Sequence, residues 1–168
     1  MIMDHPFPNR KNPRLPKYDY SQNGAYFVTI CLKPRLPILS QVVGAGPRPA
    51  RSVLTPLGQL IADTWNDLPN HNPGISLGPF IVMPDHIHGV VILEGRAGLG
   101  PAPTPLPELM RQLKSFSARR INQFRGTPGA PLWQRGYYEH VIRSQQDLDE
   151  AAEYILGNPG RWVEKYSI

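Results

Sequence analysis

Apolar residues in this chain gather in short runs, separated by polar stretches that are rich in proline and glycine. Runs of β-branched and aromatic residues between turn residues are typical of strands, whereas apolar residues spaced three and four apart indicate helices. On these patterns we expect strands at 24–33, 77–83, 86–93 and 132–143, and helices at 55–68, 107–124 and 146–157.

Proline and threonine mark several of the expected boundaries. Thr55 is suited to cap a helix that has Pro56 in its first turn. Pro84-Asp85 leaves room only for a tight link between two strands, and Pro159 predicts that the last helix ends before it. The pattern therefore predicts an α+β fold, a ferredoxin-like or RRM-like sandwich whose antiparallel sheet has helices packed mainly on one face.

The length of 168 residues fits a single domain that spans residues 1–168. Within it we expect an extended basic arm at 1–22 and Gly/Pro loops at 43–52 and 94–107. No apolar run approaches the roughly 20 residues of a membrane helix, and the N-terminus lacks the pattern of a secretion signal. Because Cys31 is the lone cysteine, we expect no internal disulfide, and a cytoplasmic location without a membrane partner.

His86-Ile87-His88 is the most informative motif of the chain. Successive side chains of a strand point to opposite faces, so His86 and His88 point the same way. Two neutral imidazoles side by side can bind one divalent ion. Without further context, histidines satisfied near a core are the alternative interpretation.

The last expected helix holds candidate partners for this pair. Tyr154 and Asn158 are four residues apart and therefore neighbours on the helix surface. The amide oxygen of Asn158 can complete the coordination of a hard ion such as Mg²⁺ or Mn²⁺, and the phenol of Tyr154 can act as a nucleophile. A phenol with a pKa of about 10 attacks poorly at neutral pH, but a metal that polarises a phosphoryl group offsets that weakness.

Positive charge is concentrated in two parts of the chain, whose net charge is +5. Such a concentration favours binding of a polyanion, whereas a solvated helix face is the alternative for the second part. The candidate DNA contacts are Arg10, Lys11, Arg14 and Lys17 in the arm, and Arg111, Lys114, Arg119 and Arg120 in the expected helix 107–124.

The sequence resembles the REP-associated tyrosine transposases, a branch of the HUH single-tyrosine transposases that act on single-stranded DNA. The resemblance covers nearly the whole chain. It rests on blocks in the expected order, which are Tyr18-Asp-Tyr-Ser-Gln-Asn-Gly-Ala-Tyr-Phe-Val-Thr29, Met83-Pro-Asp-His-Ile-His-Gly89, Leu113-Lys-Ser-Phe-Ser-Ala-Arg-Arg-Ile-Asn122, Leu132-Trp-Gln-Arg-Gly-Tyr-Tyr-Glu-His-Val-Ile-Arg143 and Glu153-Tyr-Ile-Leu-Gly-Asn-Pro159.

The resemblance implies a role for each matched residue. His86, His88 and Asn158 would hold the divalent metal, and Tyr154 would attack a DNA phosphodiester. The product would be a 5′-phosphotyrosine and a free 3′ hydroxyl, which a later strand transfer consumes. The implied partner is a single-stranded DNA hairpin of the nucleoid, bound by a monomer or homodimer that requires no other protein.

Two other functions remain open at this point. A non-catalytic module would bind nucleic-acid hairpins without cutting them. A metal hydrolase with a water nucleophile would need further carboxylate or histidine ligands. Asp85 is expected to face away from His86 if it lies on the strand, and this objection weakens if the turn rotates it. Tyr137 and Tyr138 are rival phenols that would point to opposite faces of the expected strand 132–143.

Overall fold

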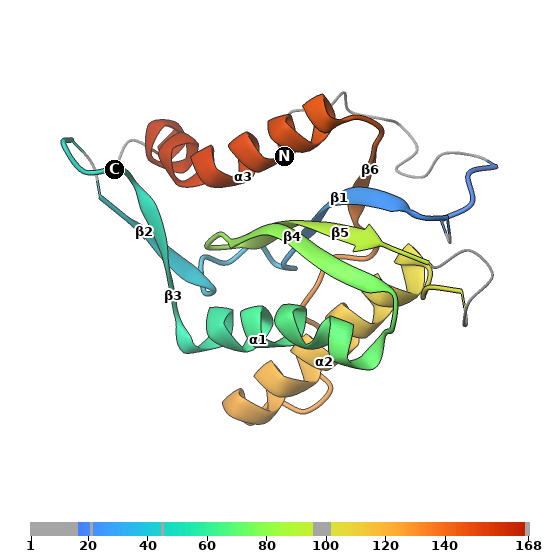
Figure 1. The fold of residues 1–168 in the computed structure, drawn as a ribbon. Coiled ribbons are helices and arrows are strands. Elements are labelled where there is room, and N and C mark those ends of the chain that lie inside the picture. Colours follow the sequence, from blue (N-terminus) through green and yellow to red (C-terminus); the bar gives the residue numbers. More distant parts are fainter. Residues whose placement is uncertain (1–16, 21, 45, 96–101, 167–168) are drawn as a thin grey trace.

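The main sheet is antiparallel and has the strand order β4-β5-β1-β6 (Figure 1). The structure is a computed structural model that describes residues 17–20, 22–44, 46–95 and 102–166. The structure contains both helices and an antiparallel sheet, so the predicted α+β class is confirmed. The elements are β1 (Gly24–Cys31), β2 (Ser40–Val43), β3 (Arg51–Leu54), α1 (Pro56–His71), β4 (Ile75–Val82), β5 (His86–Leu93), α2 (Leu106–Arg125), β6 (Tyr138–Ile142) and α3 (Gln145–Tyr166).

Strand β5 is central to the sheet, and its side chains alternate between two packing layers. Ile87 and Val91 belong to the larger core on one face. Val90 belongs to a smaller cluster on the other face, where the rings of His86 and His88 also meet aromatic residues of α3. The period-two pattern of an ordinary strand therefore decides which side chains reach the candidate site.

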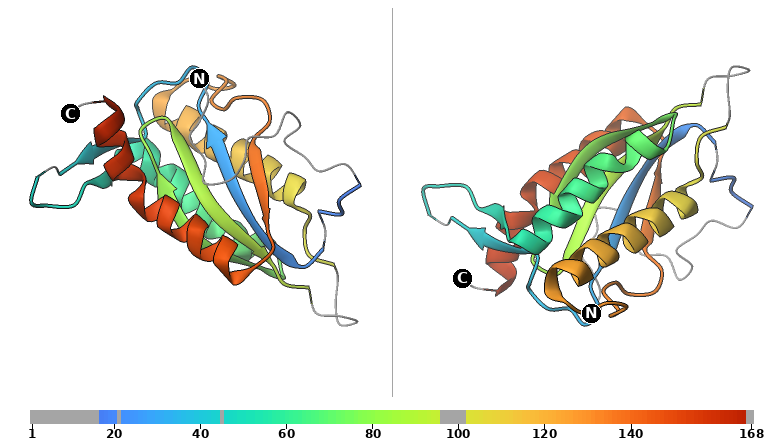
Figure 2. Two further views of the ribbon diagram at one scale, coloured as in Figure 1. Left: turned by 90° about the horizontal axis from the view of Figure 1, so that it is seen from above. Right: turned by 90° about the horizontal axis from the view of Figure 1, so that it is seen from below.

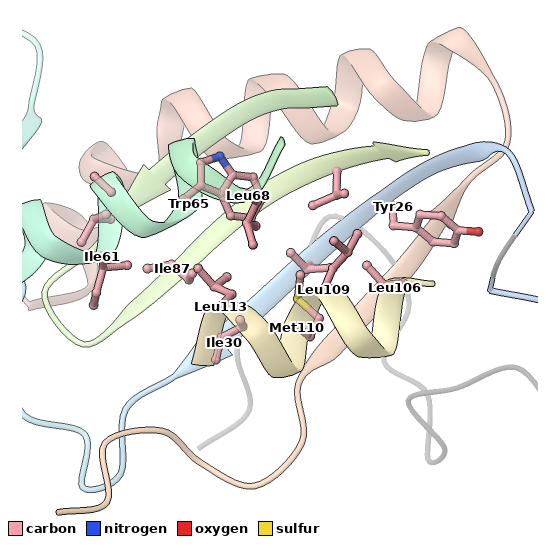
Figure 3. Packing of buried hydrophobic residues seen from close by; sticks show 14 of the residues in the cluster. Tyr26, Ile30, Ile61, Trp65, Leu68, Ile87, Leu106, Leu109, Met110 and Leu113 are labelled. Carbon is pink, nitrogen blue, oxygen red and sulfur yellow. The ribbon is translucent and has the colours of Figure 1, made fainter. Parts of the chain in front are cut away.

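The larger core lies between the sheet and the helices α1 and α2, which lie side by side over one face (Figures 2 and 3). Thr55 caps α1 as predicted, because its Oγ1 accepts a hydrogen bond from the Gly58 amide at 3.2 Å. The residues labelled in Figure 3 are Tyr26, Ile30, Ile61, Trp65, Leu68, Ile87, Leu106, Leu109, Met110 and Leu113.

Helix α3 covers the opposite face of the sheet (Figure 1). It packs there through Ala151, Tyr154 and Ile155 against Phe27 and Val90. Two helices thus cover one face and α3 the other, which agrees with a sheet whose helices lie mainly on one face.

The helices of the described residues are amphipathic, with their buried residues on the side that faces the sheet. In the part of the chain that the structure describes, no helix combines the length and the apolar character needed to cross a membrane.

The prediction that the last helix ends before Pro159 is wrong, because α3 continues to Tyr166. A proline inside a helix lacks the N–H donor and crowds the preceding turn. Here the carbonyl of Tyr154 accepts hydrogen bonds from Asn158 Nδ2 at 3.3 Å and from Arg161 Nη1 at 2.9 Å. The bond that Pro159 cannot make is the one to the Ile155 carbonyl, so these donors support the turn before the proline, and the burial of Pro159 favours a helix that local preference would have ended.

The expected strand 132–143 is also shorter than predicted, because β6 begins only at Tyr138. Before it, Trp133 makes an isolated bridge to Leu32. Gly136 then adopts a φ of 77°, a left-handed conformation that interrupts the extended backbone.

The sequence pattern did not predict the hairpin formed by β2 and β3. These short strands pair through Val43 and Arg51, so the loop expected at 43–52 is shorter than predicted. The hairpin projects beyond one end of the sheet, beside the C-terminal part of α3 (Figure 2). The loop expected at 94–107 likewise ends earlier, because α2 begins at Leu106; residues 96–101 lie outside the described part.

Candidate active site

His86 and His88 lie at the start of β5 and point to the same face, as their spacing predicts. Their Nε2 atoms are 3.1 Å apart, and both residues are buried. The antiparallel register with β1 sets Thr29 opposite His88, and Thr29 Oγ1 is 2.7 Å from His88 Nδ1. The Phe27 ring stacks on the other side of His88, with centroids 5.5 Å apart. Both rings are therefore held in place before any ligand binds.

Asp85 orients His86 from the turn that precedes β5. Its Oδ1 is 2.6 Å from His86 Nδ1, and Arg35 donates to both carboxylate oxygens at 2.9 and 3.1 Å. Burial alone raises the pKa of Asp85, but the hydrogen bonds from His86 and Arg35 lower it to about 2. Asp85 lies in the turn and not on the strand, so the condition under which it would face away from His86 is not met.

The hydrogen bonds of the two rings determine where their lone pairs point. An ionised Asp85 only accepts, so His86 Nδ1 carries the proton; burial lowers the pKa of His86 and favours a neutral ring with a lone pair on Nε2. The hydroxyl of Thr29 can accept or donate, so His88 can take either tautomer. When His88 Nδ1 donates to Thr29, both Nε2 atoms carry a lone pair, and these atoms are 3.1 Å apart.

This donor set fits a divalent metal. Two nitrogen atoms 3.1 Å apart suit neighbouring ligands of one ion with metal–nitrogen bonds of about 2.1 Å. An outer carboxylate that accepts from a histidine ligand, as Asp85 does here, is typical of metal centres in proteins. Among the described residues no group of three His, Cys, Asp or Glu side chains forms a site, so a third protein ligand would have to be of another type.

Helix α3 brings the ring of Tyr154 to His88. The ring centroid of Tyr154 is 5.2 Å from that of His88 and 6.0 Å from that of Phe27. Asn158 is buried one turn later, and its contact with the Tyr154 carbonyl uses the amide nitrogen rather than the oxygen. A phenol thus stands beside the histidine pair; metal binding by Asn158 remains a prediction.

Two further residues of α3 adjoin the site and were not predicted as functional. The guanidinium carbon of Arg161 lies 4.4 Å from the centre of the Tyr154 ring, a cation–π contact. The Trp162 ring is 6.2 Å from the His86 ring. Their spacing from Tyr154 can be read from the sequence, but a helix that ended before Pro159 would not have carried them on the same face as Tyr154.

The rival phenols lie on opposite faces of the sheet, as predicted. Tyr138 belongs to the cluster that contains Tyr154, with its ring 6.3 Å from Phe27, whereas Tyr137 packs against the larger core. The ring of Tyr154 contacts that of His88, which makes Tyr154 the candidate phenol nearer to the histidine pair. His140 lies 3.8 Å from Asp147, in keeping with a structural histidine.

The candidate DNA contacts of α2 lie on the face of the sheet opposite to Tyr154 (Figure 1). Arg111 pairs with Glu108, and Arg120 donates to Thr64. Lys114 Nζ donates to the carbonyls of Gln134 and Gly136 at 2.8 and 2.6 Å, which gives it a structural role beside any contact with DNA. Arg119 is exposed and is the cation of this group best placed for a phosphate.

The candidate contacts in the arm are described only in part. Lys17 is exposed in a turn, with a φ of 62°. Arg10, Lys11 and Arg14 lie outside the described residues.

Comparisons with known proteins bear on the fold and on the family resemblance. No model of a known protein family matches the chain. An uncharacterized protein of Haemophilus influenzae is 29% identical over 175 residues, which cover 93% of this chain and 91% of that protein. A second H. influenzae protein, provisionally named a REP-associated tyrosine transposase, is 25% identical over 147 residues, covering 84% and 73% of the two chains.

Among solved structures, that of a REP-associated tyrosine transposase bound to a REP hairpin covers 89% of this chain and 73% of its own, with a TM-score of 0.60 and 21% identity. At that identity the likeness shows the fold. In fold, and in its similarity to a curated sequence of that name, the chain resembles the REP-associated tyrosine transposases, as its motifs predicted.

Proposed function

We propose that the chain is a metal-dependent endonuclease and strand transferase that cuts single-stranded DNA near hairpin sequences through a 5′-phosphotyrosine intermediate. The observation that carries the proposal is the packing of Tyr154 against His88, beside a histidine pair whose Nε2 atoms are 3.1 Å apart. A module that only binds DNA has no use for this combination of a phenol and two converging imidazoles.

Tyr154 supplies the nucleophile in this proposal. Its phenol oxygen forms a bond to phosphorus while the bond from phosphorus to the 3′ oxygen breaks. The proton lost by the phenol is balanced by the proton that the departing 3′ oxygen takes up, and the 5′ phosphate stays on Tyr154. The ester conserves the energy of the broken bond, so a 3′ hydroxyl can reverse the step without ATP.

His86, His88 and Asn158 are the residues that would hold the metal, Mg²⁺ or Mn²⁺. When bound, a divalent ion polarises a phosphoryl oxygen and stabilises the charge that develops during attack. Asp85 and Thr29 keep the two imidazoles in place through their Nδ1 atoms. Arg161 lies over the Tyr154 ring and would help to hold the attacking phenol in position.

The substrate follows from the family resemblance and from charge. A structurally similar transposase is bound to a REP hairpin, and a hairpin of this kind is what we propose for this chain. Its phosphates would meet Arg119 and other cations on α2, which supply affinity without sequence information. Because α2 and Tyr154 lie on opposite faces of the sheet, the DNA must pass around one of its edges.

A covalent adduct assay tests the proposal. The full chain is mixed with single-stranded DNA from the flanks of its own gene, with Mn²⁺ or with EDTA, and run on a denaturing protein gel. We expect a slow band that requires Mn²⁺ and is absent in Tyr154→Phe. The matched control is Tyr138→Phe, a phenol of the same hydrophobic cluster, which should keep the band.

The outcomes separate the possible functions. A band that persists in Tyr154→Phe contradicts the assignment of the nucleophile. Tight hairpin binding without any band supports the non-catalytic binding module. Cleaved DNA without a covalent band, in Tyr154→Phe as in the natural chain, supports a hydrolase with a water nucleophile.

A further inference from the structure

The part of α3 after Pro159 continues the line of the candidate catalytic residues. Its side chains follow at intervals of four, which keeps them on neighbouring positions of one helix face. The members of this row are Tyr154, Asn158, Trp162 and Tyr166.

The row becomes an aromatic surface beyond the histidine pair. The Trp162 ring lies 6.2 Å from the His86 ring, and the Tyr166 ring lies 4.4 Å from the Trp162 ring. Trp162 is half-buried and Tyr166 is 40% exposed, whereas the core tryptophan Trp65 is 1% exposed. Aromatic rings that only filled the core would be covered as Trp65 is, so part of this surface is open to a ligand.

Positive charge borders the aromatic rings. Lys165 Nζ lies 5.6 Å from the centre of the Tyr166 ring, and Arg161 lies over Tyr154. Aromatic side chains flanked by cations are the combination that binds single-stranded nucleic acid, because bases stack on the rings while the cations meet the backbone. An apolar protein partner would leave these cations without a counter-charge.

We infer that Trp162 and Tyr166 form a stacking surface for a base of single-stranded DNA in the nucleotide next to the scissile phosphate. The inference rests on the proposed function and names a part of the substrate that the site grips. Trp162 adjoins His86 directly, so the stacked base belongs to a nucleotide beside the phosphate that Tyr154 attacks. Trp162 acts as a positioning residue, because it holds the strand while other groups react.

The test combines protein variants with abasic nucleotides. A series of single-stranded oligonucleotides from the flanks of the gene carries one abasic nucleotide, moved one position at a time through the cleavage site. Adduct formation is measured at several DNA concentrations for the natural chain, Trp162→Ala, Trp162→Phe and Leu156→Ala. Leu156 is the matched control, because it lies on the same helix and is 78% exposed.

We expect an abasic nucleotide at one position to weaken DNA binding by the natural chain about 5- to 140-fold, the range of one stacked base. Trp162→Ala should bind intact DNA more weakly by a similar factor, seen mainly in KM. An abasic nucleotide at that one position should not weaken binding by Trp162→Ala any further. Trp162→Phe should recover much of the affinity, and Leu156→Ala should behave like the natural chain. If the losses from Trp162→Ala and from the abasic nucleotide multiply at every position, the stacking surface is refuted.

A fluorescence titration distinguishes failure of this inference from failure of the proposed function. In Tyr154→Phe, which cannot form the adduct, binding of intact DNA should quench a tryptophan signal that is missing when Trp162→Phe is added. Quenching that vanishes with the abasic nucleotide supports the surface even if no adduct forms with any DNA. Adduct formation by the natural chain, with no quenching from Trp162 in Tyr154→Phe, overturns the surface and leaves the proposed function intact. Absence of both overturns both.

Discussion

Gly89 follows the histidine pair directly, and the structure predicts that alanine cannot replace it without cost. A Cβ atom at Gly89 would lie 2.5 and 2.7 Å from Cη2 and Cζ2 of Trp65, and 3.1 Å from Cδ2 of Phe80. Trp65 is fully buried and stacks on Phe80, with ring centroids 4.5 Å apart. The indole ring therefore has no open side toward which it can move.

The size of the effect follows from these distances. Carbon atoms prefer separations of about 3.5–4.0 Å, so the Trp65 ring must shift by about 1 Å within a close-packed core. Overpacking of this kind costs about 1–3 kcal/mol, and the rigid stack places Gly89→Ala toward the upper end. For a chain of this length we expect the melting temperature to fall by about 4–10 °C.

The assay is urea unfolding of Gly89→Ala, alone and combined with Trp65→Phe. Phenylalanine lacks the indole atoms that the new methyl group meets, so Gly89→Ala should cost at least about 1 kcal/mol less in that background. Gly160→Ala is the matched control, because a Cβ there meets nothing within 4 Å and should be neutral or slightly stabilising. A loss below about 0.5 kcal/mol, or the same loss in both backgrounds, would refute the reasoning.

Three further predictions concern charged and polar groups. Asp85→Asn should be less stable than the natural chain by about 2 kcal/mol above about pH 4, and this difference should narrow as the pH falls toward 2. The reason is that a carboxylate with a depressed pKa stabilises the fold only while it is ionised. A difference in urea unfolding that stays constant across this pH range contradicts the prediction. Lys114→Met should lower the free energy of unfolding by about 1–3 kcal/mol and leave the salt dependence of DNA binding unchanged, because the Lys114 ammonium donates to two carbonyls. Arg119→Gln should leave stability unchanged and should reduce the slope of log binding constant against log salt concentration by about 1 in a binding titration. Tyr20→Phe removes the hydrogen bond to buried Glu139 and should cost about 1–3 kcal/mol in thermal or urea unfolding, whereas an unchanged midpoint would show that the bond contributes little.

The sequence by itself determined the local geometry of the candidate site. Strand periodicity sets His86 and His88 on one face, and helical periodicity makes Tyr154 and Asn158 neighbours. Both features depend on residues close together in the chain, so backbone geometry alone establishes them. The fold class followed for the same reason, because each apolar run is long enough to show its period. The motif blocks also named the family that the fold resembles.

Only the tertiary structure decided which distant residues complete the site. The register between β1 and β5 places Thr29 against His88, and Arg35 reaches Asp85 across the turn before β5. These contacts join residues far apart in the chain, where local patterns carry no information. The structure also placed the basic helix α2 and helix α3, which carries Tyr154, on opposite faces of the sheet.

The last helix shows most clearly where local reasoning fails. Proline is a strong local signal for a helix end, and Pro159 on its own justified a stop. Packing of the buried Pro159 outweighs that preference, and Asn158 and Arg161 donate to the Tyr154 carbonyl in the turn before it. The added turns place Trp162 beside His86, because the rest of the fold buries Pro159 and lets α3 continue beyond it.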